Sequence, residues 1–401
     1  MKRLILIFLC LVSFSALAAD KDSTAFVHRI GINVRPGYLS QQHEFFRGAN
    51  ALGRPMIATA SAHLQYSFSF PSSSLLGRLY PTAYQGVGVA SNTFGNHTEI
   101  GTPTAVYLFQ GAQIADFGHG LSLDYEWNFG VSMGWNPFEE AGPDGTGGNP
   151  ANHVVGTKVN AYLNAGLMLS WHPSPRWSLS AGIDMSHFSN GDTTFPNSGV
   201  NTIGARLGVT HSFCAGESSL GNRHYGRKRP AIWFVDRWTC DVLAYGAWNE
   251  EQVEYHDREY RADGKFAVAG IHVNPLCNVW FPYLSVGAAV DIQYNEGMNI
   301  QNHIAGVNPV TDEIRFYRPP FWEQFAVGLS LRAELQMPIF AINIGLGHNI
   351  LYKGEELGGL YSLLSLKTFV TDKLFMNVGL KVSDKNCSNN LMLGLGWRFG
   401  N

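Results

Sequence analysis

Apolar and polar residues alternate with a period of two along several segments of the chain, as they do in a strand with one apolar face. Between 157 and 171 the odd positions read Thr, Val, Ala, Leu, Ala, Leu, Leu and Trp, and the even positions between them are mostly polar or small. The same alternation recurs at 177–185, 199–213, 325–334 and 391–399. The pattern therefore predicts an all-β protein.

A water-soluble β-sandwich would show the same alternation, but the polar faces and the connections favour a barrel in a membrane. The polar faces are rich in Gly and Ser and also carry Lys158, Arg206, Arg332 and Glu334, as a polar lumen would. Long Gly- and Asn-rich connections such as 136–155 alternate with tight ones. Outer-membrane barrels have this arrangement, with long outer loops and short periplasmic turns. We therefore predict a transmembrane antiparallel β-barrel.

The pattern gives about sixteen strands, which fall into two related halves of eight. The sequence WSLSAGIDMSHFSNG at 177–191 resembles LFMNVGLKVSDKNCSNN at 374–390, as in a diverged duplication. A single large barrel is the preferred arrangement, because closing all strands together removes every edge within the membrane. Two eight-strand barrels in tandem are the alternative.

The N-terminus predicts export. Lys2 and Arg3 precede the apolar run 4–17, and Ala16-Leu17-Ala18 fits a signal-peptidase site. The run is shorter than the roughly 20 apolar residues of a membrane-spanning helix. The predicted regions are a cleaved signal peptide at 1–18, a first barrel unit at 19–214, a basic linker at 215–230 and a second, degenerate barrel unit at 231–401.

Composition agrees with a barrel. The chain has 44 Gly, 10 Trp, 16 Tyr and 25 Phe but only 15% charged residues, and aromatic residues form the interface girdles of outer-membrane barrels. A net charge of −3 gives no argument for a nucleic-acid partner. The 14 His lack metal-binding spacing, so we expect neither a metal nor another cofactor. Cys214, Cys240, Cys277 and Cys387 allow one or two disulfides of undefined pairing.

Residues that could carry chemistry lie just after the alternating segment 177–185. Residues i and i+2 of a strand point the same way, so His187 and Ser189 continue the apolar, lipid-facing side of this segment at its outer end. A histidine there is costly unless it is used or lies at the headgroup level. It could act as a general base that activates the serine for acyl transfer. A polar pair bonded to water and headgroups is the alternative.

The next strand brings a third polar group to the same side. Asn201 has the parity of the lipid-facing positions that follow it, and the intervening turn can place it beside His187. An amide oxygen there could orient the imidazole. Asn190, or the backbone amides of the turn at Asn190 and Gly191, could donate to an oxyanion near Ser189.

The stretch 187–201, HFSNGDTTFPNSGVN, resembles the signature of the PagL-type lipid A 3-O-deacylases, also called acyloxyacyl hydrolases, with His-x-Ser-Asn followed by Pro-Asn-x-Gly. The resemblance implies an eight-strand outer-membrane barrel with His187 as general base, Ser189 as nucleophile and Asn190 near the oxyanion. It also implies that Asn197 belongs to the loop that carries the third catalytic group.

The chain departs from this family at that third group. The family's usual acid falls at Asn201, and an amide cannot stabilise an imidazolium by charge. Asp192 in the loop could help instead. The resemblance is strongest over the last two strands of the first half. The second half has Ser388-Asn389 but no histidine at the position that corresponds to His187.

Two classes of function remain. The first is an outer-membrane serine esterase that removes an acyl chain, the 3-O-linked hydroxyacyl chain by resemblance, from lipid A of lipopolysaccharide in the outer leaflet. The same chemistry on a phospholipid is a variant of it. The second is a non-enzymatic porin or binding scaffold, because a barrel of sixteen strands often leaves an aqueous channel. The oligomeric state stays open.

Overall fold

The computed structural model describes residues 26–142, 144–213, 237–308, 314–383 and 390–400. The predicted signal peptide and basic linker lie outside these residues. No helix in this part of the chain is both long and apolar enough to cross a bilayer.

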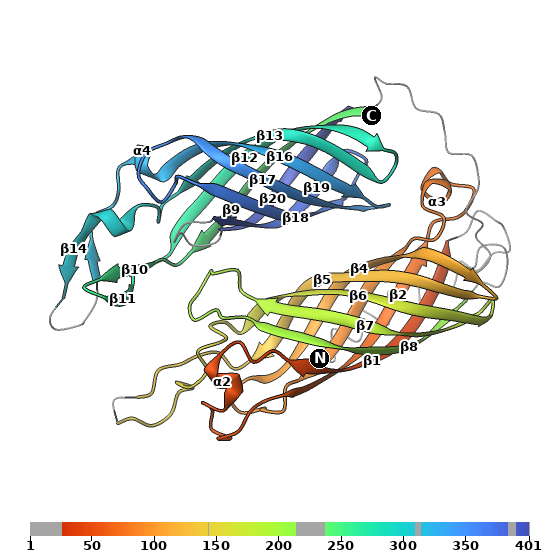
Figure 1. The fold of residues 1–401 in the computed structure, drawn as a ribbon, viewed down its shortest axis with the longest axis horizontal. Coiled ribbons are helices and arrows are strands. Elements are labelled where there is room, and N and C mark those ends of the chain that lie inside the picture. The colour runs from red at the N-terminus through yellow and green to blue at the C-terminus, as the bar shows by residue number, and fades with distance from the viewer. Residues whose placement is uncertain (1–25, 143, 214–236, 309–313, 384–389, 401) are drawn as a thin grey trace. The chain divides into compact units, whose positions relative to one another are not determined.

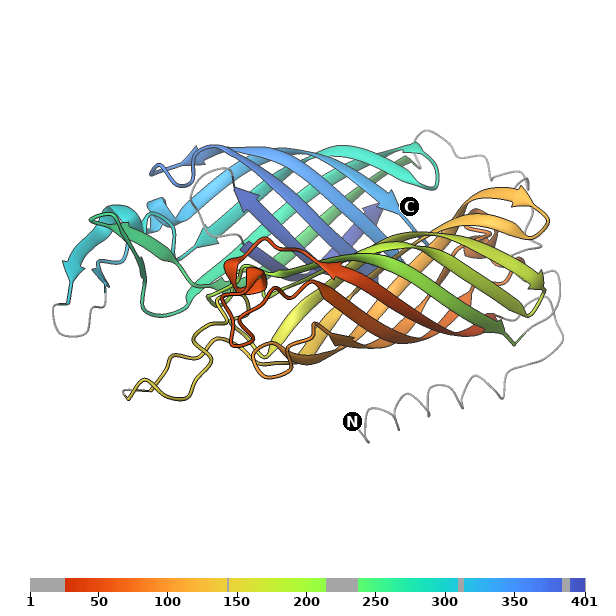
Figure 2. The same cartoon turned by 60° about the horizontal axis from the view of Figure 1, so that its bottom comes forward.

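Eight antiparallel strands of the first half close into a barrel, coloured from red to green in Figures 1 and 2. Each strand pairs with the next along the chain, and β1 pairs with β8 to close the ring. The strands are β1 (Val27–Leu39), β2 (Ala58–Ser69), β3 (Tyr84–Thr93), β4 (Gly101–Gly118), β5 (Leu121–Trp135), β6 (Val159–Ser174), β7 (Trp177–Ser189) and β8 (Val200–Ser212).

A second closed barrel of eight strands forms from the second half, with β20 paired to β9. Its strands are β9 (Trp238–Asn249), β12 (Phe266–Trp280), β13 (Leu284–Asn295), β16 (Phe325–Gln336), β17 (Phe340–Tyr352), β18 (Leu360–Phe369), β19 (Leu374–Ser383) and β20 (Asn390–Gly400). The connections of the two halves hold two small hairpins, β10 (Gln252–Tyr255) with β11 (Arg258–Arg261) and β14 (Ile304–Val307) with β15 (Ile314–Phe316), and the short helices α2 (Glu44–Arg47), α3 (Leu75–Leu79), η3 (Ile300–His303) and α4 (Phe321–Gln324).

The predicted antiparallel barrel with eight strands in each half is confirmed, but the preference for one large barrel is wrong. The first and last strands of each half hydrogen-bond to each other, β1 to β8 and β20 to β9. Each half therefore pairs its own two edge strands. A merged barrel is not needed to remove unpaired edges from the membrane.

Most long connections of the first barrel gather at one end, which we call the loop end. They join β1 to β2 (40–57), β5 to β6 (136–158) and β7 to β8 (190–199), whereas β4–β5 and β6–β7 are joined at the opposite end by two-residue turns. The predicted alternation of long loops and tight turns therefore holds for these connections but not for β2–β3, because the connection 70–83, which contains α3, is long and lies at the opposite end. With the tight turns in the periplasm, the loop end faces outward.

The two faces of the strands also agree with the prediction. On β7, Ile183 and Met185 are 62% and 63% exposed, whereas Asp184 between them is 5% exposed. Arg206 is buried in the first barrel, and Arg332 and Glu334 are buried in the second. The prediction that Lys158 faces the lumen is wrong, because this residue lies just before the first residue of β6 and is exposed.

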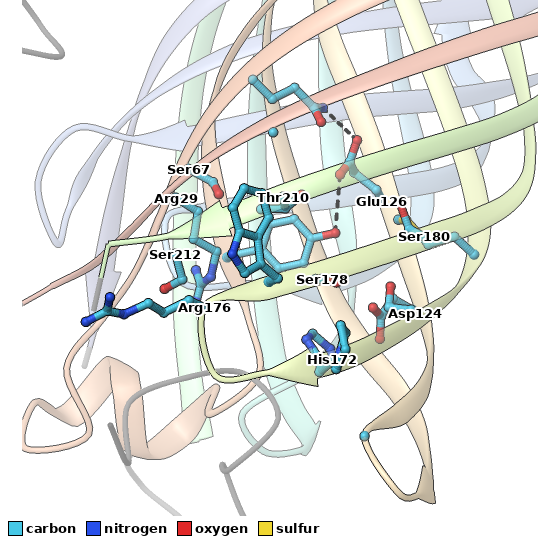
Figure 3. A pocket seen from close by; sticks show the side chains of 18 of the residues that line it. Arg29, Ser67, Asp124, Glu126, His172, Arg176, Ser178, Ser180, Thr210 and Ser212 are labelled. Atoms are coloured by element: carbon cyan, nitrogen blue, oxygen red, sulfur yellow. Dashed lines mark hydrogen bonds between the residues drawn. The ribbon is translucent and has the colours of Figure 1, made fainter. Parts of the chain in front are cut away.

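Side chains fill much of the first lumen. A cavity of about 330 Å³ opens at the end of the barrel opposite the loop end, and Glu126 lies in its wall (Figure 3). Glu126 accepts hydrogen bonds from Arg206 at 2.7 Å and Gln65 at 2.9 Å, and Arg35 lies 3.6 Å away. Toward the loop end, a cluster of buried aromatic residues that includes Trp135 continues the packing.

Buried ion pairs fill the second lumen in a similar way. Lys367 contacts both Asp241 and Glu334, and Arg398 donates to Asp241 at 2.7 Å. An eight-strand barrel is just wide enough for its inward side chains. The wide aqueous channel that a sixteen-strand barrel would have allowed is therefore absent from the described parts of both barrels.

Candidate active site

His187 and Ser189 lie at the loop end of β7, two residues apart on one face of the strand. Phe188 between them points inward and is 3% exposed. Its ring packs against Trp135 and Tyr162, with centroid distances of 5.2 and 5.1 Å. This buried contact fixes the backbone between the two polar residues, so both side chains are held on the outer surface of the barrel.

The register of the sheet places Asn201 of β8 directly opposite His187. Nδ1 of His187 lies 2.6 Å from Oδ1 of Asn201, and both residues are half-buried. The structure therefore brings together the two residues that the alternation had placed on one face. The imidazole of His187 is hydrogen-bonded to Asn201 rather than to the loop residue Asp192.

The hydroxyl of Ser189 has an amide donor beside it. Nδ2 of Asn197 donates to Ser189 Oγ at 3.1 Å, and Oδ1 of Asn197 accepts from the backbone N–H of Asn190 at 3.1 Å. The Asn197 amide is therefore a candidate oxyanion donor, whereas the backbone N–H of Asn190 donates to Asn197. The sequence had predicted Asn197 only as a supporting loop residue.

Three left-handed residues shape the loop that carries Asn197. Gly191, Asp192 and Gly199 have φ of 67°, 62° and 70°. Gly199 also allows a close approach, because a Cβ there would lie 3.1 Å from Cε1 of His187 and 3.2 Å from the carbonyl oxygen of Phe188. A side chain at this position would press on the imidazole.

Gln42, in the loop between β1 and β2, is a site residue that sequence analysis missed. Its Oε1 accepts from Nδ2 of Asn201 at 2.7 Å, and its Nε2 donates to the carbonyl oxygen of Ser198 at 2.9 Å. The barrel closes by pairing β1 with β8, which brings residue 42 next to residue 201. No local pattern around Gln42 indicates this contact, because it depends on that closure.

Helix α2 anchors the loop that carries Gln42. Phe45 and Phe46 of this helix are 1% and 0% exposed. His43 caps the helix, since its Nδ1 accepts from the backbone N–H of Phe45 at 3.1 Å. Burial lowers the pKa of His43, and nearby His153 lowers it further, so the ring stays a neutral acceptor near pH 7.

The arrangement has the parts of a serine hydrolase. It supplies an imidazole held by an amide oxygen, a hydroxyl on the same surface and an amide donor at that hydroxyl. Among the described residues, no group of His, Cys, Asp and Glu side chains could hold a metal ion. Cys240 and Cys277 are free thiols, whereas Cys214 and Cys387 lie outside the described residues.

Comparison with known families gives two matches that together span most of the chain. The profile described as "Lipid A 3-O-deacylase (PagL)" matches residues 59–210, which include the site on β7 and β8. The profile described as "Acyloxyacyl hydrolase, C-terminal domain" matches residues 238–401. No curated protein matches the chain in sequence.

Among solved structures, the chain is similar to outer-membrane proteins at low identity. Neisserial surface protein A is 10% identical, with 47% of this chain and 96% of that protein covered and a TM-score of 0.29. The outer membrane protein Omp33 of Acinetobacter baumannii is 8% identical, with 94% and 99% covered and a TM-score of 0.18. Because these TM-scores are low, the barrel architecture is established by the strand pairing of this chain itself.

We expect Gly199→Ala to lower the rate of the reaction at this site, because the added methyl group displaces the His187 ring. The left-handed backbone would also cost about 1–2 kcal/mol of stability. Gly145→Ala is the matched control, since Gly145 has a φ of 75° and open space around its Cβ position. Turnover and thermal unfolding of both variants check this. Equal activity of the two would contradict the close packing of Gly199 on His187.

Proposed function

Since this chain belongs to the PagL family of lipid A 3-O-deacylases and so is an outer-membrane ester hydrolase acting on lipid A, we propose that Ser189 is its nucleophile and that it releases the 3-O-linked hydroxyacyl chain. The observation that carries this proposal is the contact between Nδ1 of His187 and Oδ1 of Asn201 beside Ser189. These residues lie within the segment that the deacylase profile matches.

In the proposed reaction each of these groups has one role. Nε2 of His187 accepts the proton of Ser189 as Oγ attacks the ester carbonyl carbon. Nδ2 of Asn197, now next to Oγ, donates to the oxyanion of the tetrahedral intermediate. Collapse breaks the bond to the sugar oxygen, which takes the proton from His187. Water, deprotonated by His187, then attacks the acyl-serine. The bond from the acyl carbon to Oγ breaks, Oγ takes the proton back from His187, and the hydroxy fatty acid is released.

The surroundings of the site fit a substrate that stays in the membrane. Leu163 lies opposite His187 on β6, and Met185 and Ile203 precede and follow the site on β7 and β8. These three side chains are 38%, 63% and 49% exposed. An acyl chain can therefore remain against an apolar barrel surface while its ester, at the loop end, reaches Ser189.

Ser189→Ala tests the nucleophile. We expect it to lower acyl release from purified lipopolysaccharide by at least about 10³-fold, as for loss of a serine nucleophile in other hydrolases. Ser180→Ala is the matched control, because Ser180 lies on the same strand but lines the luminal cavity. Mass spectrometry of the acid released from lipopolysaccharide, and from phospholipid vesicles in a parallel reaction, identifies the ester, since release of a 3-hydroxy acid supports lipid A and release of a phospholipid fatty acid does not. Equal rates for wild type and Ser189→Ala would refute the proposal.

Asn197→Asp tests the oxyanion donor. The substituted carboxylate can still accept from the backbone N–H of Asn190, but it has no N–H to offer the oxyanion. We expect kcat to fall by about 10²–10³-fold with little change in KM. Steady-state kinetics and a thermal melt of the same preparation separate this loss from misfolding. An unchanged kcat would assign the oxyanion to other donors.

A further inference from the structure

Gln42 connects two backbone carbonyls to the imidazole of the site through one chain of hydrogen bonds. Its Nε2 donates to the carbonyl oxygens of Ser198 at 2.9 Å and Gly199 at 3.3 Å. Its Oε1 accepts from Nδ2 of Asn201 at 2.7 Å. Oδ1 of Asn201 then faces Nδ1 of His187 at 2.6 Å.

The two backbone carbonyl groups fix the direction of this chain of hydrogen bonds. A backbone carbonyl oxygen can only accept a hydrogen bond, so the nitrogen of the Gln42 amide must face the loop and its oxygen must face Asn201. The nitrogen of Asn201 must then face Gln42, which turns its oxygen toward His187. We infer that Gln42 is a positioning residue that sets the orientation of the Asn201 amide.

The orientation of Asn201 decides which nitrogen of His187 carries the proton. Because Oδ1 only accepts, Nδ1 must be the protonated nitrogen, and Nε2 is left bare. A bare Nε2 is what a general base for Ser189 requires. If the Asn201 amide turned over, its N–H would face Nδ1, the proton would move to Nε2, and the base would be lost. A carboxylate accepts through either oxygen and needs no such guide.

This inference rests on the proposed function, and it explains how an amide can stand where the related enzymes have an acid. The supporting loop does not depend on the Gln42 side chain, which is exposed. The backbone N–H of Ser40 donates to the carbonyl of Asn201 at 2.9 Å, and Gln41 donates to the carbonyls of Leu39 and Met56. Gln42→Ala should therefore leave the loop folded.

A double-mutant cycle between Gln42 and Asn201 tests the inference in the full-length protein. Gln42→Ala alone should lower kcat by about 10- to 100-fold without raising KM, since a wrong tautomer costs up to about 10⁴-fold in a Ser-His-Asp enzyme. In an Asn201→Asp background, Gln42→Ala should lower kcat less than about twofold, because the carboxylate needs no orienting partner. Gln42→Glu loses the donations to the two carbonyls but keeps an oxygen that accepts from Nδ2 of Asn201, so it should retain more of the wild-type kcat than Gln42→Ala.

Two outcomes of the cycle would overturn the role of Gln42. An equal loss of kcat in both backgrounds would show that Gln42 only supports the loop, and no loss in either would show that it does nothing for the site. Ser189→Ala in the same assay keeps the two proposals apart. If Ser189→Ala is inactive while Gln42→Ala is fully active, the nucleophile stands and the positioning role fails.

Nitrogen NMR of histidine-labelled protein in micelles gives a readout that does not depend on activity. The His187 signals, identified by their loss in His187→Gln, should show a proton on Nδ1 in the wild type and a mixture of tautomers in Gln42→Ala. A proton on Nε2 in the wild type would refute the inference even if Ser189 proved not to be the nucleophile.

Discussion

The need to hydrogen-bond every backbone N–H and C=O within the bilayer determines most of this structure. In hydrocarbon an unpaired strand edge costs several kcal/mol for each polar group, so a sheet must close on itself. Each half closes with eight strands. The same ladder that closes the first barrel fixes the register between β7 and β8, and that register sets His187 against Asn201. Closure through β1 and β8 also brings Gln42 to Asn201.

Eight-strand closure also explains why the candidate site lies on the outside. Charged residues such as Glu126 and Arg206, together with buried aromatic rings, fill much of the first lumen. An acylated lipid has no room there, whereas the outer surface at the loop end offers apolar side chains next to polar loops. The second barrel keeps the closed ladder and a packed lumen of its own. Ser388 and Asn389, which the duplication relates to the motif, lie outside its described residues.

Alternation predicted the strands, their two faces and the position of Asn201, because a period of two is a local property that each strand carries in its own sequence. It could not decide between one barrel and two. That choice depends on which distant strands pair, and both arrangements satisfy the same local pattern. Lys158 was misplaced because the pairing of β6 begins one residue later. The contacts of Gln42 could not be predicted from the local sequence, since its partners Ser198 and Asn201 are more than 150 residues away in the chain.

The central claim is that the hydrogen-bonded His187 makes an outward-facing Ser189 nucleophilic. The most direct measurement is reaction of the protein in micelles with a lipophilic fluorophosphonate, followed by peptide mass mapping of the adduct. The account predicts one adduct, on Ser189, whose formation slows severely in His187→Ala. An adduct on another residue, or on Ser189 at an unchanged rate in His187→Ala, would contradict it.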